Sequence, residues 1–290
     1  MSEQKRLPEI WLTECPRDAI QGMKGLVSTE TKIAYYNKLL EVGFNAIDIG
    51  SFVSHKAIPQ MADTREVLEG LDLSKKQSDF IVIVANLRGA QEACAIPMVD
   101  SVGFPFSVSE TFQQRNTNAS IEDSLNVVRS IVEETEKHGK HLIIYLSMAF
   151  GNPYDEAYDV DMVMHWMEKL AQVGVRHFMP SDTVGLADER AIKVLYTPVM
   201  KEFGQYEVGA HLHTAPYNWR FKLDMAYDLG VRRFDCAILG YGGCPMAKDE
   251  LIGNMPTEQF INYFGTRVLS KKFSIEKFAS AMRSAKSIFG

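Results

Sequence analysis

Apolar residues recur along this chain at intervals of three and four, and each such stretch ends at a glycine that precedes a short apolar run. A helix that Ser28 can cap ends at Gly43, and residues 45–52 follow as a strand. Helices that end at Gly139, Gly174 and Gly230 repeat this unit. The spacing places apolar side chains on one helix face, and glycine supplies the left-handed conformation that ends a helix. The chain therefore alternates between helix and strand.

Eight apolar runs are predicted to be strands. They cover residues 10–14, 45–52, 80–85, 99–107, 141–148, 176–180, 207–213 and 232–239. Strands that alternate with helices pair in parallel, and eight such units are typical of a (β/α)₈ TIM barrel. The alternative is an open doubly wound sheet, which is weakened because no G-x-G-x-x-G follows the first strand. We predict one catalytic domain over 1–290, with the barrel at about 8–268 and a C-terminal helical extension at 269–290.

Composition narrows the classes of partner. Hydrophobic residues make up 46% of the 290 residues, enough for a large core, and the formal net charge of -6 without a basic cluster argues against nucleic-acid binding. The four cysteines form no C-x-x-C pair, which favours free thiols in a reducing compartment. No apolar signal core begins the chain, and no run approaches the ~20 apolar residues of a membrane span. We expect a cytoplasmic protein without a membrane partner.

Polar residues gather where the predicted strands end, which is where barrel enzymes place their active sites. They are Arg17, Asp18, Asp48, Ser51, Asn86, Ser147, Asp182, His211, His213 and Cys244. A random scatter of polar residues would not favour one end of every strand. We therefore expect these side chains to share one rim of the barrel.

His211 and His213 occupy positions i and i+2 of a strand, so both imidazoles point to the same face. The pair could make ordinary hydrogen bonds, but its place at a barrel rim favours a metal site. Asp18 is the natural carboxylate ligand, unless it forms a salt bridge or caps a helix. Such ligands suit Mg²⁺, Mn²⁺, Co²⁺ or Zn²⁺. Asn254 could add an amide oxygen, or could serve only as a turn residue.

Arg17 beside a metal would stabilise a developing oxyanion, and a buried ion pair with Asp48 or Asp182 could coexist with that role. Asp182 could orient a ligand histidine, hold substrate, or cap the next helix. Cys244 lies in Gly242-Gly243-Cys244-Pro245. Its thiol could act as acid or nucleophile, or could be a small buried apolar group. The neighbouring glycines could instead cradle a phosphate.

Together these motifs resemble the 3-hydroxy-3-methylglutaryl-CoA lyase family, over about residues 8–264. The matching segments are Pro16-Arg17-Asp18 with Gln21 and Lys24, residues 51–54 and 58–61, Asn86-Leu87-Arg88-Gly89, residues 181–185, His211-Leu212-His213, and residues 242–245. The last segment is close to a signature of these lyases. The resemblance implies cleavage of 3-hydroxy-3-methylglutaryl-CoA to acetyl-CoA and acetoacetate, a step of leucine degradation and ketone body formation.

The resemblance also implies roles for individual residues. Asp18, His211, His213 and Asn254 would bind the divalent cation, with Mg²⁺ or Mn²⁺ expected and Zn²⁺ or Co²⁺ as alternatives. Arg17 would stabilise the thioester enolate and Cys244 would protonate the carbanion carbon. Supporting or substrate-binding residues would be Asp182, Asp48, Ser51, Gln21, Asn86 and Ser147, with Lys24 at the coenzyme A end. The base stays open among Asp18, Asp182 and His211. A homodimer is also expected, because barrel enzymes of this family commonly dimerise.

Several positions depart from the family pattern. Cys15 and Ala19 replace two glycines, Asp48 replaces a glutamate, Thr214 replaces an aspartate, and the loop over 248–252 carries larger residues. A lyase for a longer-branched 3-hydroxyacyl-CoA is therefore an alternative. The others are an enzyme that condenses acetyl-CoA with a 2-oxo acid, an acyl-CoA-binding protein without turnover, and an unrelated phosphosugar barrel enzyme.

Overall fold

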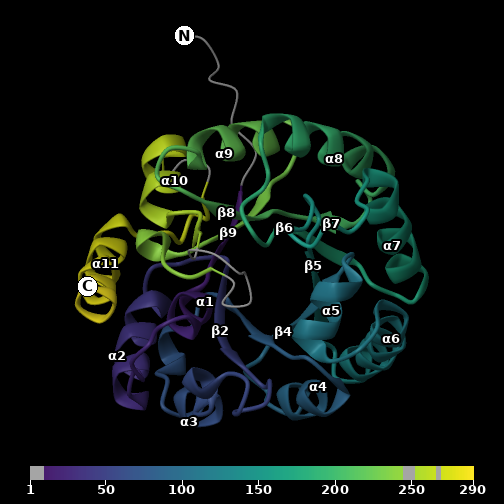
Figure 1. The fold of residues 1–290 in the computed structure, drawn as a ribbon. Helices are drawn as coiled ribbons and strands as arrows, with labels where there is room; N and C mark the ends of the chain where they lie inside the picture. Colours follow the sequence, from purple (N-terminus) through teal and green to yellow (C-terminus); the bar gives the residue numbers. More distant parts are fainter. Residues whose placement is uncertain (1–9, 244–251, 266–268) are drawn as a thin grey trace.

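Strands and helices alternate around a ring in the computed structural model, which describes residues 10–243, 252–265 and 269–290 (Figure 1). The strands are Trp11–Glu14 (β1), Ala46–Ser51 (β2), Asp79–Ile83 (β3), Ser101–Ser107 (β4), His141–Ser147 (β5), His177–Asp182 (β6), Glu207–Val208 (β7), His211–Thr214 (β8), Arg233–Cys236 (β9) and Gly253–Asn254 (β10). The first helices are Pro16–Gln21 (α1), Thr29–Leu40 (α2), Thr64–Glu69 (α3), Leu87–Cys94 (α4), Glu110–Thr117 (α5) and Ile121–Lys137 (α6). The later helices are Val160–Gln172 (α7), Glu189–Glu202 (α8), Trp219–Asp228 (α9), Thr257–Phe264 (α10) and Ile275–Phe289 (α11). Short 3₁₀ turns cover Pro59–Met61 (η1), Leu73–Lys75 (η2) and Ile238–Gly240 (η3).

The strands form a barrel. The sheet order runs from β8 through β6, β5, β4, β3, β2 and β1 to β9, and these neighbours pair in parallel. A parallel bridge between Ala210 and Phe234 brings the last strand back to the seventh. The predicted TIM-barrel class is confirmed, and its helices form the outer ring in Figure 1.

The seventh predicted strand, 207–213, is split into β7 and β8. β7 pairs with the start of β6, and β8 pairs with its end at Ser181 and Asp182. Between them the backbone turns to the other neighbour, because Ala210 bonds to Arg233 and Asp235 of β9. A side chain at Gly209 would collide with Met179 of the barrel interior. Glycine thus permits the close approach at which the strand changes partner.

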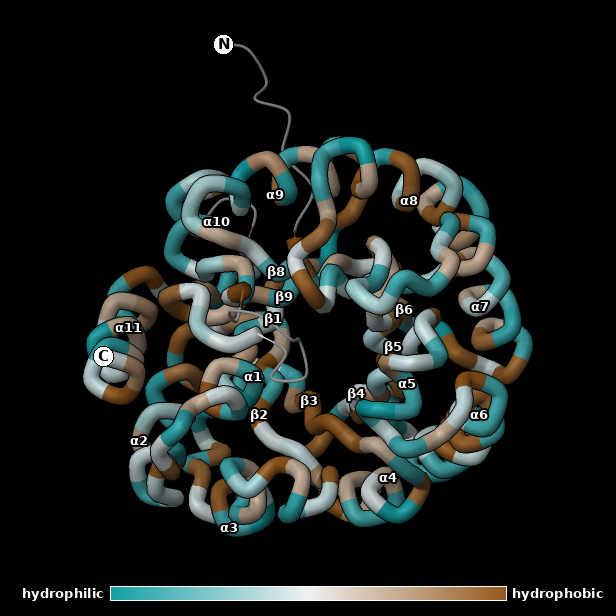
Figure 2. Tube along the Cα trace, in the orientation of Figure 1, coloured by the Kyte–Doolittle hydropathy of each residue, from teal (hydrophilic) through white to brown (hydrophobic). Residues whose placement is uncertain are grey.

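The predicted helix-ending glycines are confirmed. Gly43, Gly139, Gly174 and Gly230 all have positive φ, between 65° and 108°. Ser28 caps α2 as predicted, and Ser120 caps α6 in the same way, each by accepting a backbone N–H. The alternating hydrophilic and hydrophobic segments of the outer helices are visible in Figure 2.

The predicted C-terminal helix is present as α11, which buries one face. Phe278, Ala281 and Ala285 are at most 3% exposed, and α11 packs against α2. The ring of Phe278 lies 6.3 Å from that of Phe44. Among the described residues, no helix is both long and apolar enough to cross a bilayer.

Candidate active site

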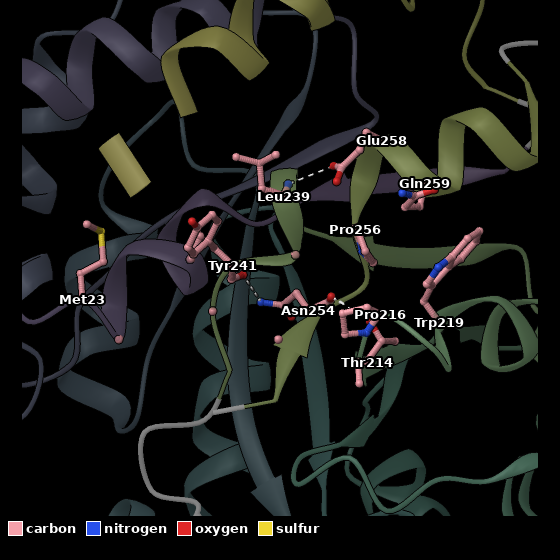
Figure 3. Close-up of a pocket in the computed structure, with 16 residues that line it drawn as sticks. Met23, Thr214, Pro216, Trp219, Leu239, Tyr241, Asn254, Pro256, Glu258 and Gln259 are labelled. Carbon is pink, nitrogen blue, oxygen red and sulfur yellow. Dashed lines mark hydrogen bonds between the residues drawn. The ribbon is translucent and has the colours of Figure 1, made fainter. Parts of the chain in front are cut away.

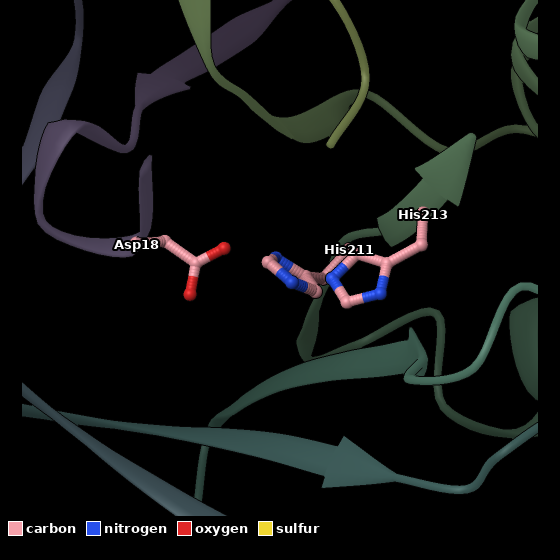
Figure 4. A group of neighbouring side chains, drawn as sticks. All are labelled: Asp18, His211 and His213. Atoms are coloured by element: carbon pink, nitrogen blue, oxygen red, sulfur yellow. The ribbon is translucent and has the colours of Figure 1, made fainter. Parts of the chain in front are cut away.

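Asp18, His211 and His213 lie together at the carboxyl end of the barrel strands. Each offers one ligand atom, and these atoms lie within 4.8 Å of one another (Figure 4). Asp18 comes from α1, directly after β1, while both histidines come from β8. The expected common face of the two imidazoles is therefore present. Two imidazoles and a carboxylate form a suitable donor set for a divalent ion.

Hydrogen bonds at Nδ1 orient the two imidazoles. His211 Nδ1 lies 3.1 Å from Oδ2 of Asp235, and His213 Nδ1 lies 3.0 Å from the carbonyl oxygen of Thr183. If each Nδ1 donates its proton, each Nε2 presents a lone pair, which is the arrangement that metal-binding histidines use. The residues present thus fit a bound cation.

The surroundings of Asp18, His211 and His213 also shift their pKa values. Burial, together with the neighbouring His211, lowers the pKa of His213 to about 4, so this imidazole is neutral at pH 7. Burial also disfavours a charged His211, but the hydrogen bond and charge of Asp235 raise its pKa overall. Burial works against the ionised form of Asp18 as well, yet Arg17 and the imidazoles lower its pKa. Asp18 is therefore a carboxylate.

Asn254 reaches the cluster through β10, which the sequence did not predict. β10 pairs antiparallel with β8, so that Asn254 stands opposite His213. The Asn254 amide donates to Oδ2 of Asp18 at 2.6 Å and to the carbonyl of Tyr241 at 3.0 Å. Gly242, at φ 111°, packs against both Asn254 and Asp18, where a Cβ would collide with the amide. The lack of a side chain at Gly242 therefore leaves room for the Asn254 amide beside Asp18.

Arg17 forms a buried ion pair with Asp48, one of the two partners considered for it. Its Nε lies 3.1 and 3.0 Å from the two Asp48 oxygens, and its Nη2 also donates to that carboxylate. Nη1 donates to Asp18 at 3.1 Å and to Gln21 at 2.7 Å. Burial raises the pKa of Asp48 to about 6 against the opposing effect of Arg17, so the pair is charged at neutral pH. These contacts use up to four of the five guanidinium N–H bonds.

A cavity of about 250 Å³ opens beside these groups. Its polar lining includes Arg17, Asp18, Gln21, Ser147, Ser181, Thr183, His211 and His213. Its apolar lining includes Val53, Ala57, Ile58, Ile83, Ala85, Pro105 and Phe112. The ring of Tyr145 also lines it and meets His211 edge-on at 5.6 Å. A ligand with one charged end and one apolar part would match this lining.

A second cavity of about 630 Å³ lies behind Asn254 and Gly242 (Figure 3). Met23, Trp219 and Tyr241 contribute to its wall. It shares Asn254 with the metal cluster but none of the other three candidate ligands among the described residues.

Comparison with known proteins assigns the family. The family model described as HMGL-like matches residues 10–284. The chain belongs to the HMGL-like family. A hydroxymethylglutaryl-CoA lyase of Bacillus subtilis is 28% identical over 268 residues, which cover 92% of this chain and 89% of that protein. A cytoplasmic 3-hydroxy-3-methylglutaryl-CoA lyase of Rattus norvegicus is 32% identical over 246 residues, 85% of this chain and 71% of the relative.

Solved structures of this family share the fold. The crystal structure of the Bacillus subtilis HMG-CoA lyase superposes with a TM-score of 0.90 at 26% identity and covers 98% of this chain and 96% of its own. An HMG-CoA lyase from Acinetobacter baumannii, solved in complex with coenzyme A and 3-methylmalate, gives a TM-score of 0.89 at 27% identity. That match covers 97% of this chain and 92% of the other.

The structure does not bring every predicted residue of this HMGL-like chain to the cavity. Ser51 is buried and bonds to the carbonyl of Ile83. Asn86 caps α4 by accepting the N–H of Gly89 at 2.9 Å, and Lys24 is exposed. These three are not among the described residues that line the cavity. Cys244 lies outside the described residues, as does most of the 248–252 loop.

Asp182 is also absent from the described cavity lining. Its Oδ2 lies 2.6 Å from Nζ of Lys222, and its Oδ1 accepts the N–H of Ala187. The suggestion that Asp182 caps the next helix is wrong, because Asp188 caps α8.

Sequence reasoning missed the partners of the two histidines. Asp235 and Thr183 meet them across 24 and 30 residues of chain. Asp235 carried one usable signal, since it is a charged residue inside the apolar strand over 232–239. Lys222 carried another, because it lies on the largely apolar face of a predicted helix that also holds Phe221, Met225 and Leu229.

Proposed function

We propose that this chain is a divalent-metal-dependent carbon–carbon lyase that cleaves 3-hydroxy-3-methylglutaryl-CoA to acetyl-CoA and acetoacetate. The observation that carries the proposal is the Asp18–His211–His213 cluster beside the Arg17 guanidinium in one cavity. The relatives whose names state this activity cover most of the chain. The solved relative with bound coenzyme A supports an acyl-CoA as the class of substrate.

The cation would be held by Asp18, His211 and His213, with Asn254 next to Asp18 as the fourth candidate. When bound, the ion supplies a Lewis acid that makes a hydroxyl group easier to deprotonate. Mg²⁺ or Mn²⁺ is the proposed ion, and Zn²⁺ or Co²⁺ is compatible with the same donors.

The reaction breaks the bond between C2 and C3 of the acyl group. A base accepts the proton of the C3 hydroxyl, C3 becomes the ketone carbon of acetoacetate, and the bonding electrons move to C2 and the thioester oxygen. A proton delivered to C2 then completes acetyl-CoA. Arg17 is proposed to stabilise the enolate, because one Nη2 N–H bond is free of the contacts described above and the side chain lines the cavity.

Geometry narrows the choice of proton acceptor. Asp18 and His211 line the cavity, whereas Asp182 is bound to Lys222 and is not among the described lining residues. We therefore favour Asp18 or His211 over Asp182 as the base. Cys244 stays proposed as the acid that protonates C2, although it lies outside the described residues. Ser147 and Gln21 are proposed to contact substrate, because both line the cavity.

The first experiment measures acetoacetate and acetyl-CoA formed from 3-hydroxy-3-methylglutaryl-CoA with Mg²⁺ or Mn²⁺, a thiol reductant and a matched EDTA control. Metal-dependent formation of both products in equal amounts is expected, and His213→Ala should lose bound metal and activity together. Absence of product from a folded, metal-loaded protein would overturn the proposal. Longer-branched 3-hydroxyacyl-CoAs and the condensation of acetyl-CoA with a 2-oxo acid would then be assayed.

Homodimerisation, a cytoplasmic location and the domain limits at 268 and 269 stay predictions. Sedimentation velocity of the full chain tests the first of them. A single species at twice the 32.7 kDa chain mass is the expected result.

A further inference from the structure

Lys222 is a fully buried lysine behind the candidate metal site. Lys222 belongs to α9 and is 0% exposed. Its ammonium group lies 2.6 Å from Oδ2 of Asp182, 2.8 Å from the carbonyl oxygen of His213 and 3.4 Å from that of Gly185. An ammonium has three N–H bonds, so these three oxygens can satisfy it completely.

These contacts connect Lys222 to both the backbone and the imidazole of His213. Lys222 holds the main-chain carbonyl of His213 directly. It also holds Asp182, and the next residue, Thr183, provides the carbonyl that bonds to Nδ1 of the His213 imidazole. The path from the His213 backbone through Lys222, Asp182 and Thr183 back to the His213 ring is therefore closed. One connected set of residues therefore contacts both the backbone and the ring of His213.

Fold stability alone does not require this ion pair. Burial of two charges costs free energy that their attraction only repays in good geometry, and apolar residues of similar volume are often equally stable at such places. A methionine at 222 and a leucine at 182 would fill the same space. The polar pair, by contrast, fixes the orientation of a ring that must point its Nε2 at an ion.

We propose that Lys222 and Asp182 are positioning residues that hold His213 in its cation-binding orientation. This inference rests on the metal site of the proposed function. It gives Asp182 a role that acts through the lysine and Thr183 rather than through contact with substrate. Hydrogen-bond partners of ligand histidines typically change metal affinity by about 10–100-fold when they are removed.

Lys32 on α2 provides a control for Lys222. It is also a buried lysine, 2% exposed, that donates to a carboxylate, Asp63 at 2.7 Å, and to a main-chain carbonyl, that of Gln60. Neither Lys32 nor Asp63 is among the described residues that line the metal cavity. Lys32→Met therefore removes the ion pair of another buried lysine without touching His213, with a carboxylate partner whose side chain is 23% exposed against 1% for Asp182.

The test measures binding of Mn²⁺ and Co²⁺ alone by titration calorimetry, with no substrate present, for Lys222→Met, Asp182→Asn and Lys32→Met. Affinity should fall about 10–100-fold in the first two variants and stay unchanged in the third. The visible absorption of bound Co²⁺ should change shape only in the first two. The double variant Lys222→Met/Asp182→Leu should still fold cooperatively in denaturant and bind the ion weakly.

Wild-type affinity and an unchanged Co²⁺ spectrum in Lys222→Met would overturn the proposal. If that variant does not fold, Asp182→Asn decides, because it preserves the shape of the pair, and wild-type affinity there has the same meaning. Failure of the proposed function looks different: the wild type would bind the ion but form no product. Loss of affinity in Lys222→Met would still support the positioning role in that case.

Discussion

Two buried ion pairs border the three candidate metal ligands, and they are built differently. Arg17 pairs with Asp48 and lines the cavity, where it also contacts Asp18. Lys222 pairs with Asp182 behind His213 and is 0% exposed. Among the described residues, one N–H bond of the arginine has no protein partner, whereas the three N–H bonds of the lysine all have protein oxygens within reach. One pair can therefore act on substrate, and the other can act only on the protein.

The comparison separates two kinds of loss. Substitutions in the Arg17–Asp48 pair should lower turnover while the ion still binds. Substitutions in the Lys222–Asp182 pair should lower affinity for the ion, and turnover should fall as a consequence. Metal titration combined with steady-state kinetics distinguishes the two patterns in each variant.

The largest effect is expected from Arg17→Met. Removal of an oxyanion donor typically costs about 10²–10³-fold in kcat, and this variant also leaves Asp48 buried without its cation. Mn²⁺ affinity should be retained, because Asp18, His211 and His213 remain. Arg17→Lys should recover only part of the activity, since an ammonium cannot reproduce the two-point contact with Asp48. Full activity in Arg17→Lys would show that charge alone is needed there.

Asp235→Asn is expected to be next in size. Asp235 holds His211 through a carboxylate, while the partner of His213 is a main-chain carbonyl that Lys222 supports. Asparagine can present an amide N–H to Nδ1 and so favour the wrong tautomer. Mn²⁺ affinity should fall about 10–100-fold, as measured by calorimetry. An affinity within threefold of the wild type would mean that β8 alone orients His211.

The sequence predicted the first ion pair better than the second, for a physical reason. Arg17, Asp18, His211 and His213 stand at strand ends, and a parallel barrel brings all such ends to one rim. Eight strands and the helix-ending glycines followed from local periodicity in the same way. Lys222 meets Asp182 across 40 residues of chain, and Asn254 meets Asp18 across 236. Such contacts have no local pattern, so the sequence marked Lys222 only as a polar exception.

The difference between local patterns and long-range contacts also explains why some predicted site residues do not line the cavity. Asn86 follows a strand as a site residue would, but its side chain caps α4. A helix cap and a rim ligand both favour asparagine directly after a strand, so the pattern cannot separate them. The split of the seventh strand at Gly209 was equally hidden, because it depends on Met179 and β9.

Gly242→Ala tests the packing of Gly242 against Asn254 and Asp18, next to Arg17. A Cβ there would collide with the Asn254 amide, and the φ of 111° is strained for alanine. The free energy of unfolding should fall by about 1–3 kcal/mol, and Asn254 should be displaced from Asp18. Chemical denaturation measures the first effect. Gly25→Ala is the control, since nothing lies within 4 Å of a Cβ at that position. Equal stability of the two variants would contradict the packing described here.

The smallest effect concerns Glu14, a third buried carboxylate at a strand end, which has no cationic partner among the described residues. It accepts the N–H of Ile238 at 2.8 Å and the hydroxyl of Thr257 at 2.6 Å. Burial raises its pKa to about 8, although these two hydrogen bonds oppose the shift. The native state thus keeps a proton between about pH 4.5 and 8 that the unfolded chain loses. The stabilisation is full below pH 4.5 and declines as the pH rises through this window.

Glu14→Gln removes this titration while it keeps the shape of the side chain. Relative to the variant, the wild type should lose up to about 1.4 kcal/mol of unfolding free energy per pH unit in that window, as measured by urea denaturation at pH 5, 6, 7 and 8. Glu41 is the control, since Lys277 and Lys75 lower its pKa to about 2. Glu41→Gln should change the pH dependence only in more acidic solution. Parallel wild-type and Glu14→Gln curves from pH 5 to 8 would mean that this buried carboxylate is already ionised in the native state, despite having no cationic partner among the described residues.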